Sequence, residues 1–386
     1  MGQNLGLRAG EWVEVKSKDE ILETLNEKGQ LEGLPFMPEM FLYCGQRFRV
    51  FKRAHKTCDP PNGMGGRRMR SAVHLEDARC DGQAHGGCQA GCLIFWKEQW
   101  LEKVNNMDES SLPSTVVIPC LQANSLSGGK ANRCSEREVE AGTRVSQDEA
   151  RSQELTYICQ STQLSYATQP LPWWDLRQYI EDYTSGNVRL SQVLAALLFT
   201  VYKTVAEAGI GLGSPMLWAY DCFQRIRGGT PYPSRGGAVP EGVQTPAVKL
   251  DLQPGEFVRV RNYPDILATL NETWHNKGMY FDSEEVPYCG GTYEVLRRVE
   301  KIIDEKTGRM LNLKSDAIIL KDVVCQARYS RCRRFCPRSI YPFWREIWLE
   351  RVADEAGESI GRKSRMRGVA VGGRSLERAN RPSGLA

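Results

Sequence analysis

The chain has 386 residues, 41% of them hydrophobic and 25% charged, so it is long enough for two or three folded domains and is globular on average. Its formal net charge of +4 comes from the C-terminus, because Gly361–Ala386 holds seven basic residues and one acidic residue. The rest of the chain has a small net negative charge. This charge balance argues against a general nucleic-acid-binding body.

Cysteine is unusually frequent, with 13 in the chain, and residues 1–8 lack the charged and apolar regions of a secretion signal. We therefore expect a reducing, cytoplasmic location. In such a compartment, clustered thiols bind metals or perform chemistry more often than they form disulfides.

A repeat organises the sequence. A shift of 245 residues places Gly10–Cys80 on Gly255–Cys325 without a gap, and 25 of the 71 aligned positions are identical. After small changes of length, the alignment continues through Cys88/Cys332, Cys92/Cys336 and Trp96–Val104/Trp344–Val352. We call residues 10–104 copy A and residues 255–352 copy B, and we interpret them as a duplicated domain.

Composition divides the chain into five predicted segments. They are a repeat domain with a four-cysteine site (1–104), a polar linker (105–154), a helical middle region (155–245), a second repeat domain with its own site (246–355) and a basic disordered tail (356–386). In the middle region, Leu190–Ala208 predicts a very apolar helix that is too short to span a bilayer. We expect it to be buried between the copies. The alternatives are a partner-binding helix or a peripheral membrane contact, for which the Arg-rich tail is a second candidate.

Within copy A, the periodicity predicts strands near residues 12–15, 48–51 and 72–75, a short helix after Lys18, and an amphipathic closing helix over Trp96–Val104. Copy B has the same pattern. The predicted fold class is α+β: two tandem small domains of SH3-like or partly open β-barrel type, each with a closing helix, joined by the helical middle region.

A hairpin in each copy is predicted to bring two cysteines together. Glycine recurs at the turn, as Gly63 after Pro60–Asn62 in copy A and as Gly308 in copy B. Antiparallel partners about these turns have a constant sum of residue numbers, near 125 in copy A and 614 in copy B. On this basis Cys44 lies beside Cys80, and Cys289 beside Cys325.

Two further cysteines follow in each copy, three residues apart, and a glycine-rich loop precedes them in copy A. Four converging thiols predict an all-thiolate metal site. The two predicted ligand sets are Cys44, Cys80, Cys88 and Cys92 in copy A, and Cys289, Cys325, Cys332 and Cys336 in copy B. Zinc and a [4Fe–4S] cluster both suit four thiolates, and unliganded core cysteines are the third interpretation.

Other candidates are weaker. His85 lies in the copy A loop and could replace a ligand, but copy B has no histidine nearby, so we expect a solvated loop residue. Cys58 corresponds to Ile303 and is expected to lie near the turn, away from the site. Cys120, Cys134, Cys159 and Cys222 show no spacing typical of a site. We find no catalytic or phosphate-binding motif, so the sequence does not decide whether the protein is an enzyme.

Several stretches resemble a family of bacterial cysteine-rich proteins with a duplicated SH3-like domain. They are Gly10–Val15, Leu34–Met40, Tyr43–Gly45, Ala84–Cys92 and Phe95–Glu98. The resemblance implies a bacterial cytosolic protein and brings no established activity. We expect a two-module metal-binding protein that acts as a scaffold or binds a partner protein. The alternative is an iron–sulfur electron-transfer or redox component with two clusters.

Overall fold

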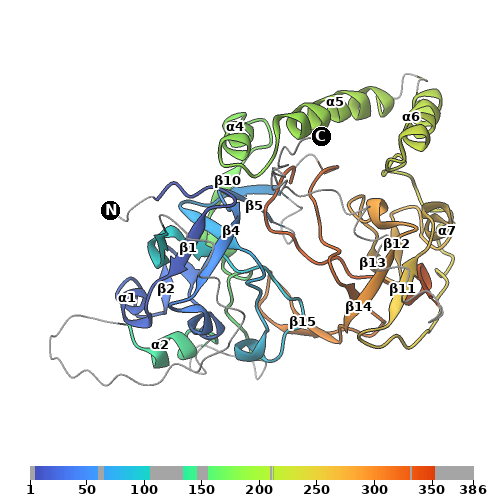
Figure 1. Ribbon diagram of the computed structural model, residues 1–386. Coiled ribbons are helices and arrows are strands. Elements are labelled where there is room, and N and C mark those ends of the chain that lie inside the picture. The colour runs from blue at the N-terminus through green and yellow to red at the C-terminus, as the bar shows by residue number, and fades with distance from the viewer. Residues whose placement is uncertain are drawn as a thin grey trace, which may run out of the picture.

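The computed structural model describes residues 5–59, 65–104, 134–145, 155–208, 211, 213–330 and 333–352. Two bodies of short strands and helices lie next to each other, and three helices of the middle region form an arch along one side of the molecule (Figure 1). These helices are α4 (Arg177–Thr184), α5 (Leu190–Ala206) and α6 (Gly213–Arg227). All paired strands in the described part are antiparallel, which confirms the coarse α+β class.

Each body is built on one antiparallel sheet. In copy A the sheet has the order β8-β7-β4-β1-β9, and in copy B the order is β17-β14-β11-β18. The copy A strands are β1 (Trp12–Val15), β4 (Arg47–Arg53), β7 (Ala72–Leu75), β8 (Trp96–Lys97) and β9 (Leu101–Lys103). The copy B strands are β11 (Phe257–Val260), β14 (Thr292–Arg298), β17 (Ile318–Leu320) and β18 (Leu349–Arg351).

The strand registers of the two sheets correspond position by position. Val13 pairs with Phe48 and Val258 with Tyr293, which is the same pair moved by 245 residues. The bulge between Val50 and Lys52 in β4 recurs between Val295 and Arg297 in β14. The predicted strand positions are therefore confirmed in both copies.

Smaller elements complete the described chain. The helices are α1 (Lys18–Leu22), α2 (Glu136–Ala141), α3 (Leu164–Ala167) and α7 (Tyr263–Leu267). The short strand pairs are β2 (Gln30–Leu31) with β3 (Leu34–Pro35), β12 (His275–Asn276) with β13 (Met279–Tyr280), and β15 (Lys301–Ile303) with β16 (Met310–Asn312). The last sheet joins β5 (Lys56–Asp59), β6 (Gly65–Arg68) and β10 (Gln169–Leu171). Helix α1 begins at a capping box, in which the Ser17 N–H donates to Glu20 and the Ser17 hydroxyl accepts from the Glu20 N–H.

The closing segment of each copy is not the helix that the sequence predicted. In copy A it is β8, one 3-10 turn over Glu98–Trp100, and then β9, which pairs with β1. Trp96 and Trp100 are buried in this arrangement as they would be in a helix, because the single tight turn carries the chain from one side of the sheet to the other. The same spacing of apolar residues is therefore compatible with a helix and with a strand–turn–strand segment, and pairing of β9 with β1 stabilises the second.

The tryptophans of the closing segments lie in the core of their own copy. Trp96 and Trp100 are fully buried in copy A, and Trp344 and Trp348 in copy B. The indole N–H of Trp100 donates to Thr24 at 3.0 Å, and that of Trp348 donates to Thr269, the aligned threonine of copy B, at 2.9 Å. These tryptophans therefore pack within their own copy and not between the copies.

The two copies touch instead through their hairpins and cysteine loops. The β15–β16 hairpin of copy B packs on the loop of copy A, where the N–H of Gln89 donates to the carbonyl of Lys301 at 3.0 Å. The N–H of Ile303 donates to Sγ of Cys88 at 3.4 Å. In the other direction, the N–H of Cys58 in β5 donates to Sγ of Cys336 in copy B at 3.2 Å. Each hairpin therefore covers the cysteine loop of the other copy.

Helix α5 falls within the predicted range, but its predicted burial is wrong. None of its residues is buried, and Leu198 is 71% exposed. Its neighbours α4 and α6 also expose large apolar side chains, among them Ile180, Trp218 and Ile226. Helix α6 was not predicted. Within the described ranges, no helix has both the length and the apolar character needed to cross a membrane.

Candidate metal centre

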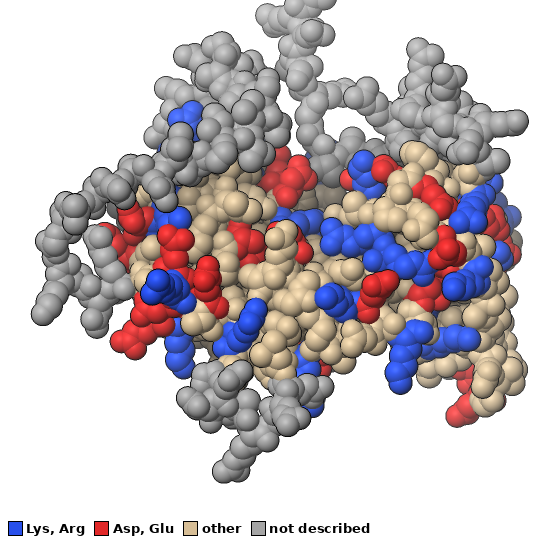
Figure 2. Space-filling view, turned by 90° about the horizontal axis from the view of Figure 1, so that it is seen from below, with Lys and Arg blue, Asp and Glu red and all other residues tan. Residues whose placement is uncertain are grey.

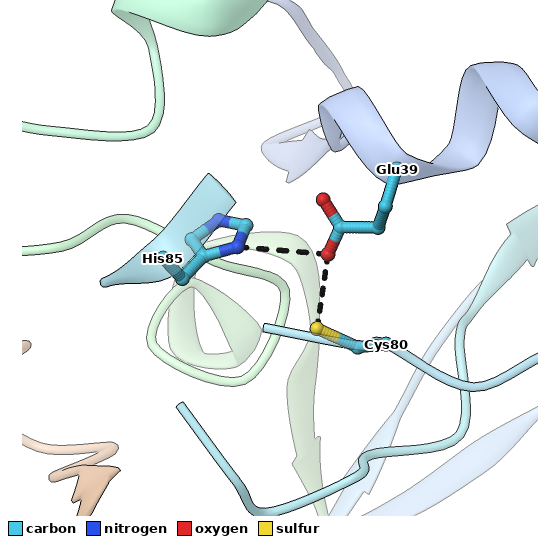
Figure 3. Close-up of side chains that lie close together, drawn as sticks. All are labelled: Glu39, Cys80 and His85. Atoms are coloured by element: carbon cyan, nitrogen blue, oxygen red, sulfur yellow. Dashed lines mark hydrogen bonds and ion pairs between the residues drawn. The ribbon is translucent and has the colours of Figure 1, made fainter. Parts of the chain in front are cut away.

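A carboxylate, a thiol and an imidazole meet at the cysteine loop of copy A (Figure 3). Glu39 comes from the first turn of a 3-10 helix over Pro38–Tyr43, and Cys80 follows β7. His85 ends a short 3-10 helix over Gln83–His85. One ligand atom from each residue lies within 4.8 Å of the other two, and no other three candidate ligands in the part of the chain that the structure describes meet so closely.

Glycine shapes the loop that carries Cys80 and His85. Gly82 has a left-handed φ of 73°, and a Cβ at this position would lie 1.9 Å from the carbonyl oxygen of Cys88. Gly86, directly after His85, is also left-handed, and its Cβ would lie 2.3 Å from the Tyr157 hydroxyl. Only glycine allows these conformations and close approaches, so the sequence forces the loop to fold back on itself.

The three side chains are buried and contact one another. The Cys80 thiol donates to Oε1 of Glu39 at 2.9 Å, and Nδ1 of His85 lies 3.5 Å from the same oxygen. His85 is 1% exposed. The expectation of a solvated histidine is therefore wrong: the glycine turns direct the ring inward, and its Nε2 bonds to the carbonyl of Ile158 at 3.0 Å.

The electrostatics of the cluster favour a bound positive charge. Burial by itself raises the pKa of Glu39, but His85 and the Cys80 thiol outweigh it and hold this pKa below its usual value. Burial raises the pKa of Cys80 strongly, and the negative charge of Glu39 adds to the increase. The carboxylate is thus charged, and Cys80 keeps its proton until a cation replaces it.

Two atoms of the cluster are buried without a hydrogen-bond partner: Oε2 of Glu39 and Nδ1 of His85. Since Nε2 of His85 donates to a carbonyl, Nδ1 faces the Glu39 carboxylate either with a proton, as in an ion pair, or with its lone pair. Two electron-rich groups at this distance repel each other unless a proton or a metal ion lies between them. Buried polar atoms are nearly always satisfied in proteins, so the unsatisfied pair fits a metal ion.

A small, partly open cavity of about 40 Å³ lies next to these residues. Four thiols contribute to its lining, from Cys80, Cys88, Cys92 and Cys159. Ile303 and Glu305 from the copy B hairpin also line it. The cavity has room for one ion or one water molecule. Burial raises the pKa of the Cys159 thiol to about 12.

The predicted set of four thiols in copy A is brought together only in part. Cys80, Cys88 and Cys92 line the cavity, but Cys44 does not. The β4–β7 ladder ends at the pair of Val50 with Leu75, so the constant-sum rule does not extend to Cys44 and Cys80. Tyr43 lies beside the chain at Cys80, where Cys44 was expected, since the Tyr43 hydroxyl donates to the carbonyl of Arg79 at 3.4 Å.

Copy B repeats this outcome. Tyr288 donates to the carbonyl of Val324 at 2.6 Å, and Cys289 packs against the core of its own copy. Cys336 and Cys58 of copy A belong to one small buried cluster, and Cys325 packs against it. Cys332, like Cys120 and the turn residues Pro60–Gly63, lies outside the described residues. The basic tail lies outside them too.

Sequence reasoning missed Glu39, although a signal was present. Both copies keep glutamate at this position, as Glu39 and Glu284, and both side chains are buried beside a cysteine loop. Glu284 accepts hydrogen bonds from the backbone of Arg328 at 2.8 Å and of Tyr329 at 2.6 Å. It therefore orders its loop, whereas Glu39 meets a thiol and an imidazole. Cys159 had no comparable signal, because it lies outside the repeat.

The surface charge agrees with the near-neutral body expected from composition. Acidic and basic side chains are interspersed over the face seen from below (Figure 2). No family model matches this sequence, and neither a curated protein nor a solved structure matches it.

Proposed function

We propose that the protein is a two-module metal-binding protein that serves as a scaffold or interaction partner, with a metal ion held by Glu39, Cys80 and His85. The observation that carries this proposal is the unsatisfied pair of buried atoms, Glu39 Oε2 and His85 Nδ1, beside the Cys80 thiol. Zinc accepts nitrogen, oxygen and sulfur ligands together. A fourth ligand is available from the thiols that line the cavity.

An iron–sulfur cluster is the second candidate, and it rests on a different observation. Cys80, Cys88, Cys92 and Cys159 line one cavity, and the N–H of Ile303 donates to the sulfur of Cys88. Four thiolates and N–H···S hydrogen bonds are typical of such clusters. This set would serve electron transfer, and it would not need Glu39 or His85 as ligands.

We also propose that the two bodies are copies of one small SH3-like or partly open barrel. Identical register across β1–β4 and β11–β14, and a bulge at the same place, support this origin. The predicted role in binding a partner is supported by the apolar side chains that α4, α5 and α6 expose together. An apolar surface of this kind is typical of an interaction site.

Metal analysis of the full chain, purified without oxygen, tests the proposal. We expect bound zinc in the wild-type protein and its loss in His85→Ala and Glu39→Gln. Cys222→Ser, in α6 and outside the cavity, is the matched control and should keep the metal. Circular dichroism of each variant shows whether it remains folded.

The same variants separate the two candidates. A brown protein with broad visible absorbance that survives His85→Ala but is lost in Cys159→Ser supports the cluster. A colourless protein that loses its metal in His85→Ala supports zinc. A folded wild-type protein that binds neither zinc nor iron after reconstitution contradicts both.

A further inference from the structure

A second group of thiols lies where the two copies meet. Cys58 of copy A and Cys336 of copy B are both buried, and Cys325 packs against them. The backbone N–H of Cys58 donates to Sγ of Cys336 at 3.2 Å. None of these residues lines the cavity beside Glu39, so this group is distinct from the first centre.

Strand β5 places Cys58 at this interface. Cys58 pairs with Gly66 in β6, and β6 in turn pairs with β10, so the hairpin is held in a three-stranded sheet. Ile303 occupies the corresponding position in the copy B hairpin, 245 residues later. Its N–H donates to a thiol of copy A, just as the N–H of Cys58 donates to a thiol of copy B.

The difference between Cys58 and Ile303 follows from what each hairpin covers. The hairpin with Ile303 covers the copy A cavity, which receives an additional thiol, Cys159, from the middle region. The hairpin with Cys58 covers the copy B loop, and Cys58 is the thiol from outside copy B in that contact group. Each thiol group therefore includes one cysteine from outside its own copy.

The surroundings of the second group suit a negatively charged complex. Arg338 is 1% exposed, and its charge acts on both Cys58 and Cys336. The ammonium group of Lys52 is close enough for Cys336 and Cys325 to influence it. A metal ion bound by three thiolates carries a net negative charge, which Lys52 and Arg338 offset in part, Arg338 being also paired with Glu305.

We propose that Cys58, Cys325 and Cys336 form a second thiolate metal site, shared between the two copies, for a zinc-like divalent ion. The three sulfurs do not all lie within 4.8 Å of one another, so binding must draw Cys325 towards the contacting pair of Cys58 and Cys336. The site joins one half of the molecule to the other, and its metal would fix their relative position.

Titration of the metal-free full chain with Co²⁺ tests this site. Thiolate-to-cobalt absorbance reports sulfur ligation, and equilibrium dialysis reports the number of ions bound. We expect about two ions in the wild-type protein and about one in Cys58→Ser, with a matching loss of thiolate absorbance. Cys58→Ile is a second variant that preserves packing, because isoleucine fills the same position in copy B. It should also bind about one ion.

His85→Ala separates failure here from failure at the first centre. It should lose the first ion and keep the one that depends on Cys58, and His85→Ala with Cys58→Ile should lose both. Cys134→Ser, at a buried cysteine outside both groups, should bind as the wild-type protein does. Unchanged stoichiometry and absorbance in folded Cys58→Ile would overturn the proposal. A Cys58–Cys336 disulfide in protein purified from reducing conditions would overturn it too.

Discussion

Arg53, which is partly exposed, forms an ion pair with the buried Glu98 that holds the beginning of the described chain on the copy A sheet. Nη1 of Arg53 lies 3.8 Å from Oε1 of Glu98, whose side chain is fully buried. The Glu98 carboxylate also accepts hydrogen bonds from the backbone N–H groups of Gly6 and Leu7, at 3.1 and 3.3 Å. In copy B, Arg298 and Glu346 form the same pair, and Glu346 accepts from Leu252.

Replacement of Glu98 by alanine should therefore destabilise copy A. The change leaves two backbone donors without their acceptor and removes the carboxylate beside Arg53, which costs about 1–3 kcal/mol of unfolding free energy. Glu102→Ala, at an exposed position in β9, should change it by less than about 0.5 kcal/mol. Urea unfolding followed by tryptophan fluorescence measures both. Equal effects at the two positions would contradict this role of Glu98.

His74 should make the protein sensitive to acid. Burial lowers the pKa of His74 from 6.5 to about 3, so the folded state resists a proton that the unfolded state binds. Stability from this group is complete above about pH 6.5 and is lost as the pH falls towards 3. Copy B has Ile319 at the matching position.

The variant His74→Ile tests this dependence. Between pH 7 and pH 4.5, the wild-type protein should lose about 2 kcal/mol more unfolding free energy than the variant. Urea unfolding at a series of pH values gives the comparison. Parallel curves for the two proteins would show that His74 is not neutral in the fold.

Gly82→Ala should disrupt the cysteine loop. A left-handed backbone costs a residue other than glycine about 1–3 kcal/mol, and the new Cβ would also collide with the Cys88 carbonyl. We expect a lower melting temperature and weaker metal binding. Gly65→Ala is the control, because its Cβ meets nothing within 4 Å. A Gly82→Ala variant with wild-type melting and metal content would show that the loop is shaped differently.

The exposed face of α5 should tolerate charge. Leu194 and Leu198 are 53% and 71% exposed, so changing both to glutamate should alter the unfolding free energy by no more than about 0.5 kcal/mol each. Urea unfolding measures this change in the double variant. Leu320→Glu, at a fully buried position, should unfold copy B. Marked destabilisation by the α5 substitutions would mean that this face is covered.

Much of each copy could be predicted from the sequence because it depends on local patterns. Alternating apolar residues define β1 and β11, and Gly308 has the left-handed φ of 73° that its turn required. The predicted sums of 125 and 614 agree closely with pairs such as Val50 with Leu75 and Lys301 with Asn312.

The errors arose where distant segments decide the outcome. The closing segments satisfy both a helix and a strand pattern, and the edge of β1 decides between them. Cys44 lies beyond the end of its ladder, so Tyr43 takes its place. Cys58 and Cys159 reach their thiol groups through contacts between parts of the chain that no periodicity relates.

The exchange of hairpins makes the two halves non-interchangeable. A chain built from two copies of the first half would place the cysteine equivalent to Cys58 over a cavity that Cys159 already lines. A chain built from two copies of the second half would place isoleucine over both loops. A substitution in one hairpin therefore changes the surroundings of the thiols in the other half.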